Sequence, residues 1–341
     1  SNELQRYKKE HNLIDFNDMI LEFTKSDAAV PKFDVVFIDE AQDLSRMQWD
    51  MAKAIWQKTT DSFIAGDDDQ AIFRWAGADV DSFIAQEGQM LPLQQSYRIP
   101  AKVHGLAMGI INKIKTRINK SWNPKIHEGS LSRYDDFEDI NMSSGEWLVL
   151  ARTKYILDKL EPTLYENGYY YNNKFKKQKE HTLHLAALDW ENLCKGQLLS
   201  YDQVLRIYGY MHVDKTKLKS MLKDSMYDMD TLKKHYGLKT NAVWFEAFDA
   251  APRREINYLK QMRRRGEKLN QAPRITLSTI HGAKGGEAEN VVLLTDLSFN
   301  TMKSYEKNPD DENRLFYVGA TRTKEHLHII EPKQEYKGYK L

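Results

Sequence analysis

Cysteine and long apolar runs are nearly absent from this sequence. The 341 residues contain one cysteine, Cys194, which excludes a disulfide framework within the chain and indicates a reducing, intracellular compartment. No apolar run approaches the roughly 20 residues that a membrane span needs, and the first residues lack the pattern of a signal peptide. We therefore expect a soluble, cytoplasmic protein without a membrane partner.

An excess of charge of either sign is also absent, because 50 basic residues stand against 49 acidic ones and leave a formal net charge of +1. Any nucleic-acid surface must then come from local patches. Two basic runs can bind phosphates or can form solvated helix faces. The stronger run comprises Arg253, Arg254, Lys260, Arg263, Arg264, Arg265 and Lys268, and the weaker one comprises Lys174, Lys176, Lys177 and Lys179.

Strand and helix signals alternate over the first hundred residues. Apolar runs at 35–39 and 62–66 predict two strands that are buried on both faces, and helices are expected at 13–23 and 44–57. This alternation favours a parallel α/β sheet. A second α/β set is predicted after Pro100. Its clear strands are expected at 146–151, 275–278, 290–294 and 326–330.

A long stretch between these strands has helix-period patterns and many charges but few strand signals. We read it as a helical accessory insertion at 172–272. The expected organisation is a first domain at 1–100, a second domain built from 101–171 and 273–341, and this insertion within the second domain.

Two adjacent carboxylates follow the first predicted strand. Asp39 and Glu40 would stand at its C-terminal end, where open α/β sheets bind ligands. Asp39 is then placed to hold Mg²⁺ that bridges nucleotide phosphates, and Glu40 to orient or deprotonate an attacking water. The alternative is a strand that ends in a polar turn without chemistry.

The segment Gly66–Ala78 follows the second predicted strand and combines a turn, an acidic run and aromatic residues. The acidic run suits a site rich in metal and water, and the amide of Gln70 can sense a phosphate and its attacking water. Phe73 and Trp75 flank a cation and suit base stacking. They can equally be ordinary core aromatics beside a turn.

Two arginines and a glycine-rich loop complete the candidate site. Arg98 follows Tyr97 in a polar segment, and Arg322 stands near the end of a predicted helix at 312–324. Either arginine can stabilise a transferring phosphoryl group or can be a solvated surface charge. The segment Thr276–Glu287 joins a predicted strand to a glycine-rich loop with polar tips.

Taken in order, these segments resemble the motifs of the UvrD/Rep/PcrA family of superfamily 1A DNA helicases. Residues 37–43 (FIDEAQD) are similar to the family's Walker B motif, and Ile14–Ile20 resembles the segment that precedes it. The third to sixth motifs are matched by 66–78, 95–98, 276–287 and 317–322.

The resemblance implies two RecA-like parallel-sheet domains of the P-loop NTPase type, the first of them incomplete, with ATP and Mg²⁺ as cofactors. Asp39 and Glu40 would bind the metal, and Glu40 would be the general base. Gln70 would report on the γ-phosphate, and Arg98 and Arg322 would stabilise its charge. The other implied nucleotide contacts are Tyr97 to adenine, Glu287 to the ribose, and Gly285.

The resemblance also implies single-stranded DNA and single/double-strand junctions as partners, with 3′ to 5′ polarity. Phe73 and Trp75 would line the single-strand track, and Thr279 and His281 would contact the DNA. ATP would close the cleft between the two domains, and hydrolysis would reopen it.

One family element does not occur in these residues: a G-x-x-x-x-G-K-[ST] phosphate loop. Because this loop supplies the backbone amides and lysine that hold phosphates, we expect little or no ATPase activity from the chain alone. The chain also opens with Ser1 rather than methionine, so we expect a piece of a longer gene product.

The missing loop has structural and functional consequences. We expect the strand at 35–39 to be supported by another chain, such as one that carries an N-terminal half, or by a lattice contact. Other positions also differ from the family's motifs. Ala76 stands where family members commonly have an arginine, and Gly286 and Ala288 stand where they have apolar residues beside the residue that corresponds to Glu287. The alternative to an ATP-driven helicase is a non-catalytic single-strand-binding relative, or one half of a split helicase.

Overall fold

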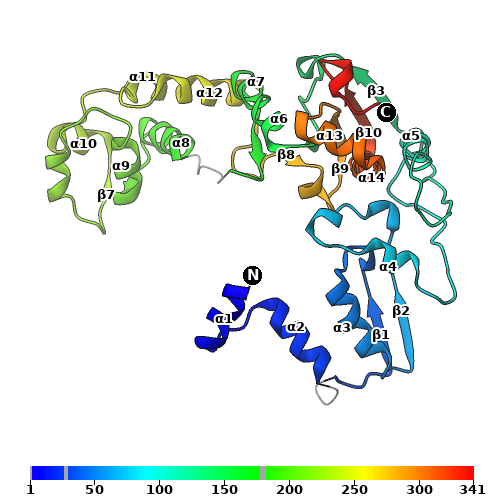
Figure 1. Ribbon diagram of the computed structural model, residues 1–341. Helices are drawn as coiled ribbons and strands as arrows, with labels where there is room; N and C mark the ends of the chain where they lie inside the picture. The colour runs from blue at the N-terminus through cyan, green and yellow to red at the C-terminus, as the bar shows by residue number, and fades with distance from the viewer. Residues whose placement is uncertain (1, 27–29, 177–181) are drawn as a thin grey trace. The chain divides into compact units, whose positions relative to one another are not determined.

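The computed structural model describes residues 2–26, 30–176 and 182–341 (Figure 1). The chain forms two compact units. Unit 1 comprises Ser1–Asp136, Leu150–Thr153 and Thr279–Leu341, and unit 2 comprises Phe137–Val149 and Lys154–Ser278. Among the helices of the described ranges, none is both long and apolar enough to cross a membrane.

The first part of unit 1 contains a small parallel sheet and its flanking helices. Strands β1 (Val35–Ile38) and β2 (Asp61–Ile64) pair in parallel, with Phe37 opposite Phe63. Helix α2 (Phe16–Lys25) packs against α3 (Arg46–Trp56). Each begins with a reciprocal cap, Asp15 with Asp18 and Ser45 with Gln48, because these side chains satisfy the free amides of the first turn. The remaining helices here are α1 (Asn2–Glu10) and α4 (Val80–Ile84).

The predicted burial of these two strands is wrong. Alternate residues of β1 are half-buried, but its other face is open, and Phe37 is 76% exposed. The neighbouring Phe63 is 54% exposed, and the two rings stack with centroids 5.0 Å apart. A strand of a parallel sheet is buried only when neighbouring strands and helices cover both of its faces. In the part of the chain that the structure describes, this sheet has two strands.

The second sheet is larger and confirms the predicted α/β class. Its six strands lie in the order β3-β10-β9-β4-β8-β5. β10 pairs in parallel with β3 and β9, and β5 pairs in parallel with β8. The bounds are β3 Ser130–Tyr134, β4 Trp147–Ala151, β5 Tyr171–Asn173, β8 Ile275–Thr279, β9 Ala288–Leu294 and β10 Thr323–Ile330. The strands β3 and β5 were not predicted.

Helices α5 (Ala101–Ile111), α13 (Phe299–Lys307) and α14 (Pro309–Ala320) complete unit 1. α14 packs against α5 and is buried from Glu312 to Ala320. Tyr339 is also fully buried, stacks on Phe316 at 3.9 Å, and donates a hydrogen bond to Asn313 Oδ1 at 2.7 Å. The final residues of the chain therefore help to hold α14 in place.

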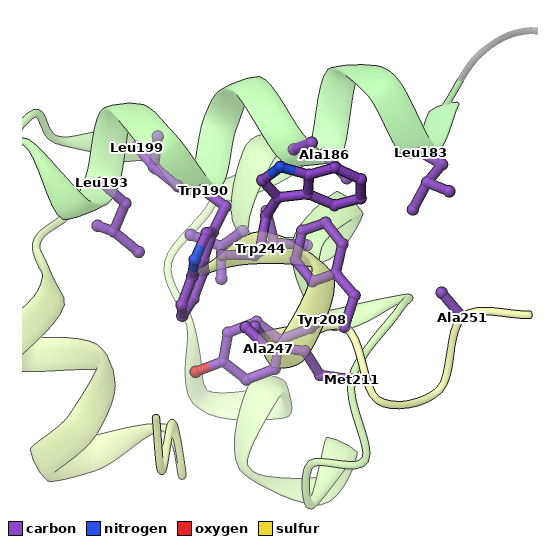
Figure 2. Packing of buried hydrophobic residues seen from close by; sticks show 14 of the residues in the cluster. Leu183, Ala186, Trp190, Leu193, Leu199, Tyr208, Met211, Trp244, Ala247 and Ala251 are labelled. Atoms are coloured by element: carbon purple, nitrogen blue, oxygen red, sulfur yellow. The ribbon is translucent and has the colours of Figure 1, made fainter. Parts of the chain in front are cut away.

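Unit 2 is mostly helical and has its own core (Figure 2). Trp190, Tyr208 and Trp244 lie at the centre of this core, and the indole of Trp190 donates to the Ala242 carbonyl at 2.9 Å. The helices are α6 Lys154–Asp158, α7 Glu161–Glu166, α8 Thr182–Cys194, α9 Tyr201–Tyr208, α10 Met229–His235, α11 Trp244–Ala247 and α12 Arg253–Arg264. A short antiparallel pair joins β6 (Leu199–Ser200) to β7 (Met226–Tyr227).

The stronger basic run lies on and just after α12, and several of its cations stack on aromatic rings. The guanidinium of Arg254 lies 4.6 Å from the ring centre of Tyr165, and Arg265 lies 4.0 Å from that of Tyr169. Lys260 lies over a phenylalanine ring in the same way. These side chains therefore contribute to packing within unit 2, and phosphate binding by them stays a prediction.

The weaker basic run is only partly described. Lys176 forms ion pairs with Asp158, at 2.9 Å, and with Glu161, while Lys177 and Lys179 lie outside the described residues. Lys176 therefore has nearby acidic partners within unit 2.

Candidate functional site

The carboxylates Asp39 and Glu40 directly follow β1, at the predicted end of the strand. The chain ends beyond β1 and β2 are held together, because Ala65 donates to the Ile38 carbonyl at 2.7 Å and Ala41 donates to the Ala65 carbonyl at 3.0 Å. Glu40 has a left-handed backbone, with φ of +51°. Such a conformation costs free energy for a non-glycine residue and is concentrated at functional sites.

A buried glutamine fixes the turn at Glu40. The Gln42 amide donates to Glu40 Oε2 at 2.5 Å and accepts from the Asp67 backbone amide at 2.9 Å. Gly66 is required beside it, because a Cβ there would lie 2.6 Å from Gln42 Oε1. Thus Gln42 joins the segment after β1 to the segment after β2.

The donor set at this turn fits a magnesium ion. Asp39 and Glu40 are exposed carboxylates, and oxygen ligands of this kind are those that Mg²⁺ prefers. One Asp39 oxygen accepts the Glu40 backbone amide at 2.8 Å, which orients the carboxylate. The two predicted metal ligands are therefore adjacent, exposed residues at the end of β1, and metal binding by them stays a prediction.

The acidic run after Gly66 is not the open metal-rich site that the sequence suggested. Asp67, Asp68 and Asp69 lie close enough together to hold a cation, but Asp68 and Asp69 are buried. Arg117 donates twice to Asp69 at 2.8 Å, and Lys120 pairs with all three aspartates. Buried carboxylates need charge compensation. In this structure Arg117 and Lys120 provide it, where the sequence suggested a metal.

Gln70 and Arg322 meet, although 251 residues separate them in the sequence. Arg322 lies just beyond α14, is 2% exposed, and donates from Nη2 to Gln70 Oε1 at 3.2 Å. Burial, with repulsion from Arg98, lowers the pKa of Arg322 to about 10, so it remains a cation at neutral pH. The charges of Arg98 and Arg322 therefore act on each other.

Arg98 is held on one side and free on the other. Its Nη1 lies 3.5 Å from Glu287 Oε2, and Lys324 lies 2.8 Å from the other Glu287 oxygen. The hydrogen bond from Lys324 is the main cause that lowers the pKa of Glu287. Arg98 Nε is buried without a hydrogen-bond partner.

Tyr97 and Gly285 are both exposed. The Tyr97 side chain is 89% exposed, so its ring can stack on a flat ligand. Gly285 has φ of +80°, which favours glycine at this turn. Neither geometry tests the nucleotide contacts that the resemblance implies for these two residues.

Three predicted DNA contacts form one aromatic cluster. The ring of His281 lies 6.1 Å from Phe73 and 6.0 Å from Trp75, and Trp75 is 75% exposed. Burial, with a smaller effect from Arg152, lowers the pKa of His281 to about 4, so the imidazole is neutral at pH 7. Thr279 begins the same loop, where its hydroxyl accepts from the Gly282 amide at 3.1 Å.

The sequence interpretation missed the role of Lys284 in this site. Its ammonium group binds Asp43, donates to the Gln70 carbonyl at 3.0 Å, and lies 3.6 Å from Glu40. It also lies 5.3 Å from the ring centre of Phe73. Lys284 therefore connects the carboxylate turn to the aromatic cluster. A lysine between glycines reads as a loop residue, so its position in the sequence carried only a weak signal.

Two family models match the chain. Residues 1–90 match the UvrD/REP helicase N-terminal domain, and residues 254–334 match the UvrD-like helicase C-terminal domain. Together these matches cover about half of the chain; they contain Asp39, Glu40 and Gln70 in the first range and Arg322 in the second, while Tyr97 and Arg98 lie between them.

Curated relatives extend the similarity over most of the chain. It is 24% identical to the ATP-dependent DNA helicase PcrA of Bacillus subtilis, over 94% of this chain and 59% of that protein. It is 23% identical to the ATP-dependent DNA helicase srs2 of Schizosaccharomyces pombe, over 94% of this chain and 49% of that protein. The chain thus spans about half the length of the curated relatives it matches.

The motif residues, the parallel sheets and both domain matches indicate the same family. The chain belongs to the UvrD/Rep/PcrA-like family of superfamily 1A helicases.

Proposed function

We propose that this chain is part of an ATP-dependent DNA helicase or translocase that moves 3′ to 5′ on single-stranded DNA. The contact between Gln70 and Arg322 is the observation that carries this proposal, because it brings a phosphate-sensing amide to a buried cation. Arg98 pairs with Glu287 at 3.5 Å, and its charge acts on that of Arg322. Such a set suits a phosphoryl group whose negative charge must be stabilised during transfer.

Each site residue has a proposed chemical task. Glu40 orients and deprotonates the attacking water, and Gln70 positions that water against the γ-phosphate. Arg98 and Arg322 stabilise charge on the transferring group. Asp39, with Glu40, would hold Mg²⁺, which supplies neutralisation of phosphate charge when bound. Tyr97, Glu287 and Gly285 contact the nucleoside.

The aromatic cluster of Phe73, Trp75 and His281 is the proposed single-strand track, with Thr279 at its edge. A neutral imidazole and an exposed indole offer flat faces on which bases stack. We expect Trp75→Ala to weaken binding of a dT oligonucleotide about tenfold or more, since stacking contributes roughly 1–3 kcal/mol per base. Phe299→Ala is the matched control, because Phe299 is a similarly exposed aromatic residue on α13.

Fluorescence anisotropy with a labelled oligonucleotide measures both variants. Equal affinities of Trp75→Ala and the unaltered chain would refute the proposed track. Strong preference for a single strand over a blunt duplex is expected, and junctions with a single-stranded tail should bind like the single strand.

We further propose that these 341 residues alone hydrolyse ATP poorly, because they contain no G-x-x-x-x-G-K-[ST] loop. The exposed Phe37 and Phe63 support a partner segment that covers this face of the small sheet. That segment would belong to a polypeptide that carries the phosphate loop.

A non-catalytic single-strand-binding relative is the second candidate, since the absence of the loop from these residues favours it. The two candidates differ in one measurable property. A helicase part needs Glu40 for turnover when a loop-bearing polypeptide is added, whereas a binding-only protein gains no turnover.

A further inference from the structure

The most heavily paired charges of unit 1 lie beside Gln70. Asp68 and Asp69 are almost fully buried, and the segment 115–120 supplies their cations, Arg117 and Lys120. Burial alone would lower the pKa of Lys120, but Asp67 and Asp69 raise it. The ammonium group therefore stays charged. The Lys120 side chain is 18% exposed.

The segment 115–120 is fixed at its other end to α14. The backbone amides of Lys115 and Thr116 donate to the Asp310 carboxylate at 3.1 and 3.2 Å. Arg314, which is fully buried, donates to the Thr116 carbonyl at 2.5 Å and to the Asp68 carbonyl at 2.8 Å. Thus Lys120 acts from a backbone that is itself held by the helix preceding Arg322.

A continuous chain of polar contacts leads from Lys120 to Arg322. Lys120 Nζ lies 3.1 Å from Asp67 Oδ1, and Asp67 Oδ2 accepts from Gln70 Nε2 at 2.7 Å. Gln70 Oε1 in turn accepts from Arg322 Nη2 at 3.2 Å.

This series of contacts allows one orientation of the Gln70 amide. An ionised carboxylate only accepts hydrogen bonds, and a guanidinium only donates them. The NH₂ end of Gln70 must therefore face Asp67, and its oxygen must face Arg322. In the reversed orientation the Gln70 oxygen would face the Asp67 carboxylate, so that two acceptors meet. The Gln70 NH₂ group would face the Arg322 guanidinium, so that two donors meet.

We propose that Lys120 is a positioning residue, which acts through Asp67 to fix the orientation of the Gln70 amide against Arg322. Its value for phosphoryl transfer rests on the function proposed above. The geometry of the relay itself does not, and it can be tested without nucleotide.

The test compares three variants of the whole 341-residue chain. Lys120→Met removes the ammonium group, and Lys120→Arg keeps a cation at the same place. Lys125→Met is the matched control, because Lys125 has nearly the same side-chain exposure, 19%, and pairs with Glu325 at 2.6 Å rather than with an aspartate of the run 67–69. Thermal unfolding reports whether each variant is folded.

The readout is the side-chain NH₂ signal of Gln70 in protein labelled with ¹⁵N-glutamine, assigned by its loss in Gln70→Ala. We expect hydrogen exchange of this group to become about tenfold faster in Lys120→Met, as for the loss of one charge-assisted hydrogen bond. Lys120→Arg should restore slow exchange, and Lys125→Met should leave it unchanged. An unchanged signal in folded Lys120→Met, or an equal change in Lys125→Met, overturns the proposal.

Asp67→Asn keeps the proposal testable if Lys120→Met does not fold, because the Asp67 side chain is 26% exposed and its change leaves the buried aspartates paired. The same faster exchange is expected, and unchanged exchange contradicts the relay. Binding of the unaltered chain to a dT oligonucleotide is measured in parallel. Its absence would count against the proposed function and would leave the Gln70 result standing.

Discussion

The two parallel sheets described above have similar apolar strands but opposite burial. β4 is buried at every position, whereas β1, with the equally apolar sequence VVFI, has alternating exposed and half-buried residues. β4 lies inside a six-stranded sheet, whereas among the described residues β1 pairs with β2 alone. An apolar run therefore specifies a strand, but its neighbours determine whether that strand is buried.

The same contrast divides the candidate site. Arg322, which precedes a strand of the large sheet, is 2% exposed and held by several hydrogen bonds. Asp39 and Glu40, which follow β1, are exposed, and the Glu40 side chain is 65% exposed. The arginine side of the site is thus preassembled, while the carboxylate side stays open.

The largest expected effect comes from a core substitution in the large sheet. Leu293→Ala should lower the free energy of unfolding by about 2–5 kcal/mol, because Leu293 is fully buried in β9. Phe37→Ala in the small sheet should cost about 0.5 kcal/mol or less, since its ring is already in water. Urea unfolding followed by circular dichroism measures both. Comparable losses would break the comparison between the sheets.

A smaller loss in the free energy of unfolding is expected from Lys284→Met, where the carboxylate turn meets the aromatic cluster. This change leaves Asp43 without its cation, and one oxygen of Asp43 is already buried without a partner. We expect a loss of about 1–3 kcal/mol. Lys303→Met is the control, because Lys303 is exposed on α13. If both variants unfold at the same temperature, Lys284 does not stabilise this junction.

The aromatic cluster also gives the stability of the protein a pH dependence. Because the folded pKa of His281 is about 4, below the ordinary value near 6.5, the unfolded chain binds this proton first as the pH falls. His281 therefore makes stability decrease from about pH 6.5 to about pH 4.

His281→Asn should reduce the slope of stability against pH by the contribution of one proton. Part of the slope should remain, because burial also lowers the pKa values of His104 and His328. Thermal midpoints between pH 4 and 7.5 test this. An unaltered slope in His281→Asn would contradict the assigned burial of the imidazole.

Much of the fold was predictable from local patterns. The strands β4, β8, β9 and β10 and the helices α2 and α3 lie near their predicted positions, because their apolar periodicity is strong. β3 was missed because its sequence, SLSRY, alternates with polar residues, and β5 has only three residues. The exposure of β1 was not predictable, since local sequence does not report which neighbours a strand will have.

The candidate site was predictable only in part. The carboxylates at the end of β1 followed from strand position. The family resemblance alone assigned Gln70 and Arg322 to the same phosphoryl group, and their direct contact was not predicted. Arg117 and Lys120 were not singled out, because no local pattern links them to aspartates about 50 residues earlier. Long-range ion pairs of this kind require the fold.

The central claim is that these residues hold the carboxylates and arginines of an ATP-hydrolysing site without a phosphate loop. It is tested most directly by Mg²⁺-dependent, DNA-stimulated ATPase measurements on the purified chain, alone and with a separate polypeptide that carries the G-x-x-x-x-G-K-[ST] loop and its sheet. We predict turnover only in the mixture and its loss in Glu40→Gln. Robust DNA-stimulated turnover by the 341 residues alone would contradict the account.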